Sequence, residues 1–145
     1  MGRVLHEYRA GRRKPKQLRE AQGRGRDRAR PANRLHGLQW TPRGTRNCNE
    51  GGCPRCNAFV EGGTRLDECL CSHGEENAIT QAAYHGVSLR GGSIYTTFCP
   101  CLICTKMIIN AGIEEVVYNA DYPLGEVSLA LLREAGVKVR RTTIR

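Results

Sequence analysis

Regular hydrophobic and polar patterns begin near residue 73 and continue to the end of the chain. Ser72 is a favoured N-cap residue type, and the apolar positions after it follow a helical period. We expect helices at about 73–86, 100–112 and 126–135, and strands at about 93–98, 116–118 and 137–144. Strands that alternate with single helices predict an α/β fold in which a largely parallel sheet packs against helices.

The first 40 residues show neither a helical nor a strand period. They hold 12 of the 23 Lys and Arg residues but 3 of the 14 Asp and Glu residues, so the whole net charge of +9 lies in this segment. Such a composition is typical of a disordered basic tail or of an arm that binds nucleic acid. We therefore divide the chain at residue 40, with a basic, disordered segment at 1–40 and a zinc domain at 41–145.

Residues 41–72 are rich in turn residues and contain five of the eight cysteines. This composition predicts an irregular insertion at about 47–71 that is organised by a metal. Tight cysteine spacings in an intracellular protein indicate metal binding more often than disulfides. A chain of 145 residues is sufficient for one core, and it contains neither a signal peptide nor an apolar run of membrane-spanning length. We expect a cytoplasmic protein without a membrane partner.

Two short motifs carry the chemistry. His73-Gly74-Glu75 begins the first expected helix, and residues 100–104 (PCLIC) begin the second. Together they match the H-x-E and P-C-x-x-C signature of zinc-dependent base deaminases. Cys101 and Cys104 are three residues apart, so one helical turn places both sulfurs on the same face, near amide groups that favour thiolate.

The residue types assign a role to each member of the two motifs. His73, Cys101 and Cys104 provide three zinc ligands, and the open fourth position is typical of a catalytic rather than a structural site. Zinc lowers the pKa of a bound water towards neutrality. Glu75, two residues from the metal histidine, is the expected general base and acid for this water, the ring nitrogen and the leaving amine. A lone C-x-x-C or H-x-E is weak evidence, whereas the pair, each at the start of a helix, is much more specific.

At these residues the sequence resembles the dCMP deaminase family, within the cytidine deaminase superfamily. The resemblance covers roughly residues 41–140 and includes residues 41–56 (TPRGTRNCNEGGCPRC), 71–79 (CSHGEENAI), 109–113 (INAGI) and 118–122 (YNADY). It implies an α-β-α layered, mixed sheet and hydrolysis of dCMP to dUMP with release of ammonia, which supplies dUMP for thymidylate synthesis. It also implies a homo-oligomer, often a hexamer. Tyr122 is expected to contact the substrate, and Arg43 its phosphate, since Arg binds phosphate in a bidentate manner.

The cysteine-rich insertion is a candidate for a second, structural zinc site. The candidate ligands are Cys48, Cys53, Cys56, Cys69 and Cys71. Their spacings match ordinary zinc sites only loosely, and a set of free thiols under turns is the alternative.

The chain departs from the family pattern in two places. Gly74 replaces the alanine usual between the metal histidine and the glutamate, at a cost of about 1 kcal/mol of helix propensity. Residues 36–40 (HGLQW) stand where the family has Thr-Gly-Tyr-Asn-Gly. The codons CAC GGG CTA CAA TGG encode these residues, and the same bases read from the second position encode Thr-Gly-Tyr-Asn and the start of Gly. Residues 23–35 can likewise encode a hairpin of two apolar strands in the shifted frame.

We infer from this run that residues up to about Trp40 are an out-of-frame translation, with one nucleotide missing near the Trp40–Thr41 junction. Such a chain would lack the family's first helix and first two strands, and the remaining strand edge would be unpaired. Two other interpretations stay open. One is a deaminase of the same superfamily acting on nucleic acid, such as tRNA, which the neutral charge of residues 41–145 disfavours. The other is a zinc-binding homologue without turnover.

Overall fold

The protein is described by a computed structural model that covers residues 4–8, 35–58, 60–61 and 64–143. Its core is a five-stranded sheet in the order β2-β1-β3-β4-β5, in which every adjacent pair is parallel. The strands are β1 (Val4–Tyr8), β2 (Leu35–Leu38), β3 (Ser93–Phe98), β4 (Glu115–Ala120) and β5 (Lys138–Arg141). The sheet confirms the predicted α/β class.

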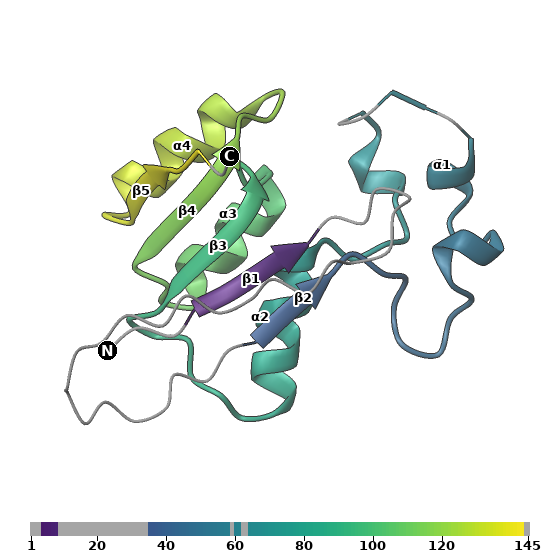
Figure 1. Ribbon diagram of the computed structural model, residues 1–145, viewed down its shortest axis with the longest axis horizontal. Helices are drawn as coiled ribbons and strands as arrows, with labels where there is room; N and C mark the ends of the chain where they lie inside the picture. Colours follow the sequence, from purple (N-terminus) through teal and green to yellow (C-terminus); the bar gives the residue numbers. More distant parts are fainter. Residues whose placement is uncertain (1–3, 9–34, 59, 62–63, 144–145) are drawn as a thin grey trace.

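Three helices connect and cover the strands: α2 (Gly74–Tyr84), α3 (Leu102–Asn110) and α4 (Gly125–Glu134). Connections between parallel strands are almost always right-handed, so successive crossovers in one direction place their helices on one face of the sheet. Figure 1 shows α2 behind β1 and β2, and α3 behind β3 and β4. All three helices begin and end close to the positions that the sequence predicts.

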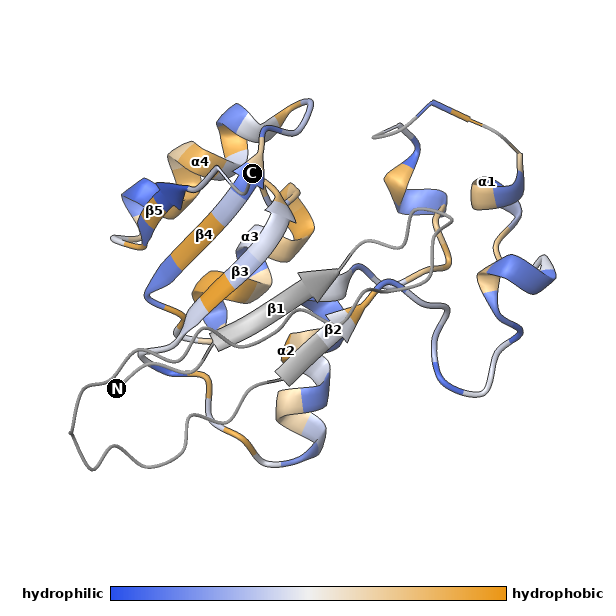
Figure 2. Ribbon diagram, viewed as in Figure 1, coloured by the Kyte–Doolittle hydropathy of each residue, from blue (hydrophilic) through white to orange (hydrophobic). Residues whose placement is uncertain are grey.

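The hydrophobic core lies between these helices and the sheet. Along β3, the buried residues Ile94 and Thr96 alternate with half-buried ones, as expected for a strand whose successive side chains point to opposite faces of the sheet. Figure 2 shows the hydrophobic residues concentrated in β4, α3 and α4. The buried cluster consists of Ala78, Ala82, Leu89, Ile94, Ile108, Ile113, Val116, Leu132 and Val137. This core holds the carboxyl end of β3 and the first turns of α2 and α3 in fixed positions.

The first part of the chain differs from the expectation. Val4–Tyr8 and Leu35–Leu38 both form strands, and β1 pairs along β3 from Val4 opposite Ser93 to His6 opposite Tyr95. The expectation that this edge of β3 is unpaired is therefore wrong. The sequence pattern does not predict these two strands, because they are short and lie among basic residues. Pairing with neighbouring strands stabilises them in the absence of a regular apolar pattern. The predicted disorder at 9–34 and the predicted loss of a first helix fall outside the described residues.

The cysteine-rich insertion extends away from the sheet, on the side of β2 (Figure 1). It contains three short elements: η1 (Cys48–Glu50), α1 (Pro54–Asn57) and η2 (Leu66–Glu68). The insertion rejoins the sheet at Ser72, whose backbone N–H donates to the carbonyl oxygen of Trp40 at 2.9 Å. Within the described residues, no helix combines the length and apolar character needed to cross a membrane.

Candidate metal and active site

The two sequence motifs meet at the amino ends of α2 and α3. His73 caps α2 and Cys101 caps α3, both in extended backbone conformation, so each helix begins one or two residues later than the sequence predicts. The extended conformation turns the two side chains towards each other. The Nδ1 atom of His73 lies 3.4 Å from the Sγ atoms of both Cys101 and Cys104.

This geometry fits a zinc ion. Zinc binds cysteine sulfur at about 2.3 Å and histidine nitrogen at about 2.0–2.1 Å in a tetrahedral arrangement, which separates sulfur and nitrogen ligands by roughly 3.5 Å. The two observed separations are 3.4 Å. The three ligand atoms all lie within 4.8 Å of one another, and Cys104 is fully buried. The predicted set His73, Cys101 and Cys104 is therefore brought together as one site.

One of the two thiols of this site, that of Cys101, favours the ionised form that zinc requires. The Cys104 thiol, the His73 ring and the Cys104 backbone N–H lower the pKa of Cys101 to about 4, against the opposing effect of burial. The same contact with Cys101, together with burial and the nearby Glu75, raises the pKa of Cys104. One thiolate and one thiol thus share the site, and a divalent cation displaces the remaining proton when it binds.

Glu75 is placed beside the ligands but does not belong to them. Its carboxylate is 5% exposed, and its Oε2 atom accepts from the Sγ of Cys104 at 3.7 Å. A buried carboxylate next to a metal site is well placed for proton transfer. The position is fixed because α2 begins at Gly74, so Glu75 lies in its first turn.

Two supporting contacts were not anticipated from the sequence. Glu76 accepts a hydrogen bond from the backbone N–H of His73 at 2.7 Å, which closes the first turn of α2. A glutamate three residues after an N-cap was the available signal. Asn77 donates from Nδ2 to the carbonyl oxygen of Leu38 at 2.5 Å, which ties α2 to β2. This second contact joins distant parts of the chain and leaves no local signal.

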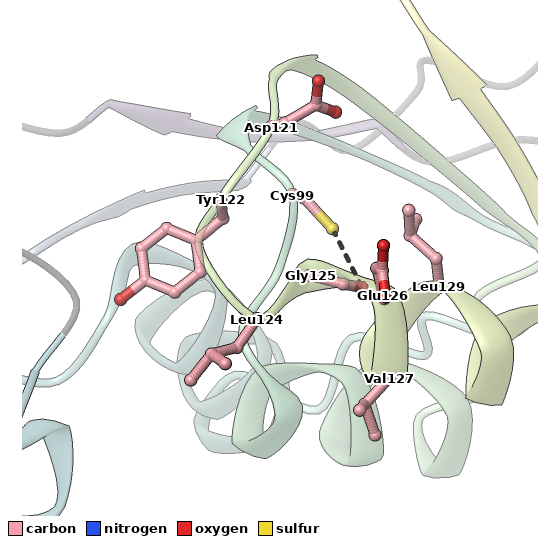
Figure 3. A pocket seen from close by; sticks show the side chains of 8 residues that line it. All are labelled: Cys99, Asp121, Tyr122, Leu124, Gly125, Glu126, Val127 and Leu129. Carbon is pink, nitrogen blue, oxygen red and sulfur yellow. Dashed lines mark hydrogen bonds between the residues drawn. The ribbon is translucent and has the colours of Figure 1, made fainter.

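Two cavities open at the carboxyl ends of β3 and β4, where open α/β sheets bind ligands. One, of about 530 Å³, is lined by residues that include Cys99, Asp121 and Tyr122. Figure 3 shows Asp121 and Tyr122 leaving the end of β4, with the Cys99 sulfur directed towards Gly125, whose carbonyl oxygen lies 4.0 Å away. Burial raises the pKa of Cys99 to about 11, so this thiol stays protonated at neutral pH.

The second cavity, of about 310 Å³, links the predicted substrate residue to the metal ligands. Both Tyr122 and Cys101 line it. Arg43, in contrast, lies at the other end of α2, where its guanidinium is 4.6 Å from the centre of the Tyr84 ring. A helix of 11 residues is about 16 Å long. The structure thus places Tyr122 beside the metal site and does not bring Arg43 to it.

Four of the five candidate ligands of the insertion lie together in the structure, and the fifth lies outside the group. The sulfurs of Cys53, Cys56, Cys69 and Cys71 all lie within 4.8 Å of one another. Cys48 does not belong to this group, although it contacts Cys56 and Cys71. Sequence spacing alone could not make this selection, because it depends on how the insertion folds back on itself.

Comparison with known proteins supports a zinc-binding deaminase region in this chain. The family described as "Cytidine and deoxycytidylate deaminase zinc-binding region" matches residues 26–120, beginning upstream of our predicted boundary at residue 40. The deoxycytidylate deaminase of Schizosaccharomyces pombe is 47% identical over 105 residues, which are 72% of this chain and 32% of that protein. The deoxycytidylate deaminase of Saccharomyces cerevisiae is 44% identical over 106 residues, which are 72% of this chain and 33% of that protein. The chain thus spans about one-third of the length of these two relatives.

A solved structure agrees with the same fold. The dCMP deaminase from the cyanophage S-TIM5, in complex with dCMP and dUMP, superposes with a TM-score of 0.59 at 28% sequence identity. The superposition covers 79% of this chain and 76% of that one. The match of the family to residues 26–120 includes both zinc motifs. The chain belongs to the cytidine and deoxycytidylate deaminase family.

Proposed function

We propose that this chain catalyses the hydrolysis of dCMP to dUMP with release of ammonia. One observation carries the proposal: His73, Cys101 and Cys104 converge at distances that fit zinc, with the buried carboxylate of Glu75 beside them. Three protein ligands and an adjacent acid are what hydrolytic deamination of a cytosine ring requires. The relatives named deoxycytidylate deaminase favour dCMP as the substrate.

His73, Cys101 and Cys104 would hold the zinc, which when bound supplies a water of lowered pKa to the site. Glu75 takes a proton from the attacking water and delivers it to the ring nitrogen. It then takes the proton from the hydroxyl group now on the ring carbon and delivers it to the amine, so that the carbon–nitrogen bond breaks, a carbonyl forms, and dCMP and water become dUMP and ammonia. Burial of Glu75 excludes bulk water from these transfers.

Tyr122 is the proposed substrate contact, because it lines the same cavity as the metal ligand Cys101. The role of Arg43 in phosphate binding stays a prediction. Its contact with Tyr84 offers no support for that role. The variant Arg43→Ala tests this role. If Arg43 binds the phosphate, its removal should raise KM for dCMP by at least about tenfold, as expected for the loss of a charge-assisted contact. KM for deoxycytidine, which has no phosphate, should not change.

We also propose a homo-oligomer, with a hexamer as the predicted size. Apolar side chains gather around the cavity next to Cys101, and they include Leu102, Ile103, Leu124 (84% exposed) and Val127 (60% exposed). Exposed apolar groups of this kind mark interaction surfaces. Light scattering of the purified chain measures the assembly directly. Cytoplasmic location and the lack of nucleic-acid and membrane partners stay predictions.

Turnover of dCMP beside a Glu75→Gln control tests the proposed activity. Glutamine keeps the size of the side chain but cannot transfer the proton, so kcat should fall by about 10²–10⁴-fold, the usual contribution of general acid–base catalysis. Zinc content should be unchanged. Equal turnover by both proteins would refute the role of Glu75. A zinc-loaded chain without turnover would favour the inactive homologue, and deamination of tRNA but not dCMP would favour the nucleic-acid enzyme.

The out-of-frame origin of residues up to Trp40 is a further proposal, supported by the shifted-frame reading and by the confinement of the net charge to 1–40. Resequencing of the gene across the Trp40–Thr41 junction tests it. A missing nucleotide at the junction would support the proposal. Codons upstream that do not give the family motif in the shifted frame would refute it.

A further inference from the structure

The insertion has almost no hydrophobic core to hold it together. Among its described residues, 47–58, 60–61 and 64–71, only Cys53 and Cys71 are buried. Its three short elements bury no other residue. Small segments that cannot bury apolar surface are usually stabilised by disulfides or a metal. The two buried residues are both cysteines of the four-sulfur group, which consists of Cys53, Cys56, Cys69 and Cys71. A link between these sulfurs would therefore stabilise the insertion.

The distances between the sulfurs exclude disulfides and fit a metal. Cys53 and Cys69 are 3.9 Å apart, Cys56 and Cys69 3.6 Å, and Cys56 and Cys71 3.9 Å. A disulfide would require about 2.05 Å. Four sulfurs at about 2.3 Å from a tetrahedral zinc are separated by roughly 3.8 Å. The three measured distances all lie close to this value.

The local backbone presents the sulfurs in the way that metal sites require. Cys53 caps the short helix α1 and Cys56 lies one turn later, the same arrangement as Cys101 and Cys104 on α3. The backbone N–H of Leu70 donates to the sulfur of Cys53 at 3.3 Å. Such N–H donors orient a thiolate and compensate its charge. The carbonyl of Cys53 accepts from the Asn57 side chain at 2.8 Å, which closes the turn.

The four-sulfur group is connected directly to the catalytic site. Cys71 precedes the metal ligand His73 by two residues, and Ser72 between them is bonded to the Trp40 backbone. A metal that fixes Cys71 also restricts the backbone at the start of α2, where both His73 and Glu75 lie. We infer that Cys53, Cys56, Cys69 and Cys71 bind a second zinc ion, and that this ion positions the first turn of α2 for catalysis. Only the positioning part of this inference rests on the proposed function.

The test measures metal content first and activity second. The purified wild-type chain, loaded with zinc and desalted, should hold two zinc ions per chain by elemental analysis. Cys56→Ser should hold one, and the matched control Cys48→Ser should hold two, since Cys48 lies outside the group. His73→Ala removes a catalytic ligand only, so it should keep the insertion zinc. If Cys56→Ser does not fold, His73→Ala still tests the second site, because the zinc that it retains must lie in the insertion.

Cobalt substitution separates the two sites spectroscopically. Cobalt bound by four thiolates gives more intense sulfur-to-metal charge transfer than cobalt bound by two thiolates and a histidine. His73→Ala loaded with cobalt should therefore show the four-thiolate spectrum alone. One zinc per wild-type chain, a Cys48→Ser variant that loses the second zinc, or iron in place of zinc after purification would each overturn the assignment.

Activity then tests the positioning role. Cys56→Ser that retains its catalytic zinc should lose at least tenfold in kcat with a smaller change in KM, since the metal acts on the catalytic helix rather than on substrate contacts. Unchanged kcat in that variant would overturn the positioning role. An inactive wild-type chain that holds two zinc ions would overturn the proposed deaminase function but leave the second metal site in place.

Discussion

Gly37 of β2 lies against the first turn of the catalytic helix, and this contact leaves no room for a side chain. A Cβ atom at this position would lie 1.7 Å from the carbonyl oxygen of Gly74 and 2.8 Å from the backbone nitrogen of Ala78. Real Cβ contacts essentially never fall below 3.0 Å, so Gly37→Ala requires a shift of about 1.3 Å, the difference between 3.0 and 1.7 Å. Because both obstacles are backbone atoms, no side chain can rotate away. The strand or the helix must move.

The displaced residue, Gly74, lies between His73 and Glu75, so the shift reaches both the proposed metal ligand and the proposed proton-transfer group. A misplacement of about 1 Å can reduce the rate by about 10²-fold. Overpacking of this kind also costs about 1–3 kcal/mol of folding free energy. We therefore expect Gly37→Ala to reduce kcat for dCMP by about 10²-fold and to lower the unfolding midpoint.

Steady-state kinetics on dCMP, zinc analysis and urea unfolding measure these effects on one preparation. Leu38→Ala is the matched control, because Leu38 belongs to the same strand but is 42% exposed. It should leave kcat within about threefold of the wild-type value. If Gly37→Ala also retains kcat within threefold and unfolds at the same urea concentration, the contact between β2 and α2 does not position the site.

Three further perturbations test other parts of the structure. Ile108→Ala should destabilise the fold by about 2–5 kcal/mol in urea unfolding, because Ile108 is fully buried in the core, whereas Lys106→Ala at an exposed position of the same helix should change stability by less than about 0.5 kcal/mol. Glu76→Ala removes the acceptor for the His73 N–H and should lower the free energy of unfolding, measured in urea, by about 0.5–2 kcal/mol. Glu76→Gln keeps an acceptor and should retain most of this stability. Chelation of zinc should abolish turnover, and added zinc should restore it; activity that survives complete metal removal would contradict the zinc mechanism.

The helices and strands from α2 onwards were predictable because their apolar positions repeat at regular intervals, and each of the three helices is followed by a glycine. Their first residues were less predictable. Ser72 has the side chain of an N-cap, yet His73 occupies that position, and its Nδ1 atom lies 3.4 Å from the sulfur of Cys101. The same holds for Cys101 at α3. At both helices a proposed zinc ligand thus stands at the N-cap position, where the sequence alone favours another residue type.

The remaining features depend on contacts between distant segments. β1 and β2 are stabilised by pairing with neighbouring strands, so their own residues carry little strand signal. The selection of Cys53 and the exclusion of Cys48 follow from the fold of the insertion, since the sequence offers both cysteines as candidate ligands on the same side of Cys56. Motifs identify the chemistry of such a site, whereas its full ligand set requires the three-dimensional arrangement.

The position of β1 between β2 and β3 has a consequence for how the chain folds. Strands β3, β4 and β5 are each joined to the next by one helix, so residues 93–141 form their contacts locally. β1 instead pairs with strands on both sides that come much later in the chain, and the closure of long loops slows such pairing. The slot between β2 and β3 is therefore expected to fill last. Until it does, two parallel edges are open to an extended segment of another molecule, which makes strand exchange between copies a route to misassembly during refolding at high concentration.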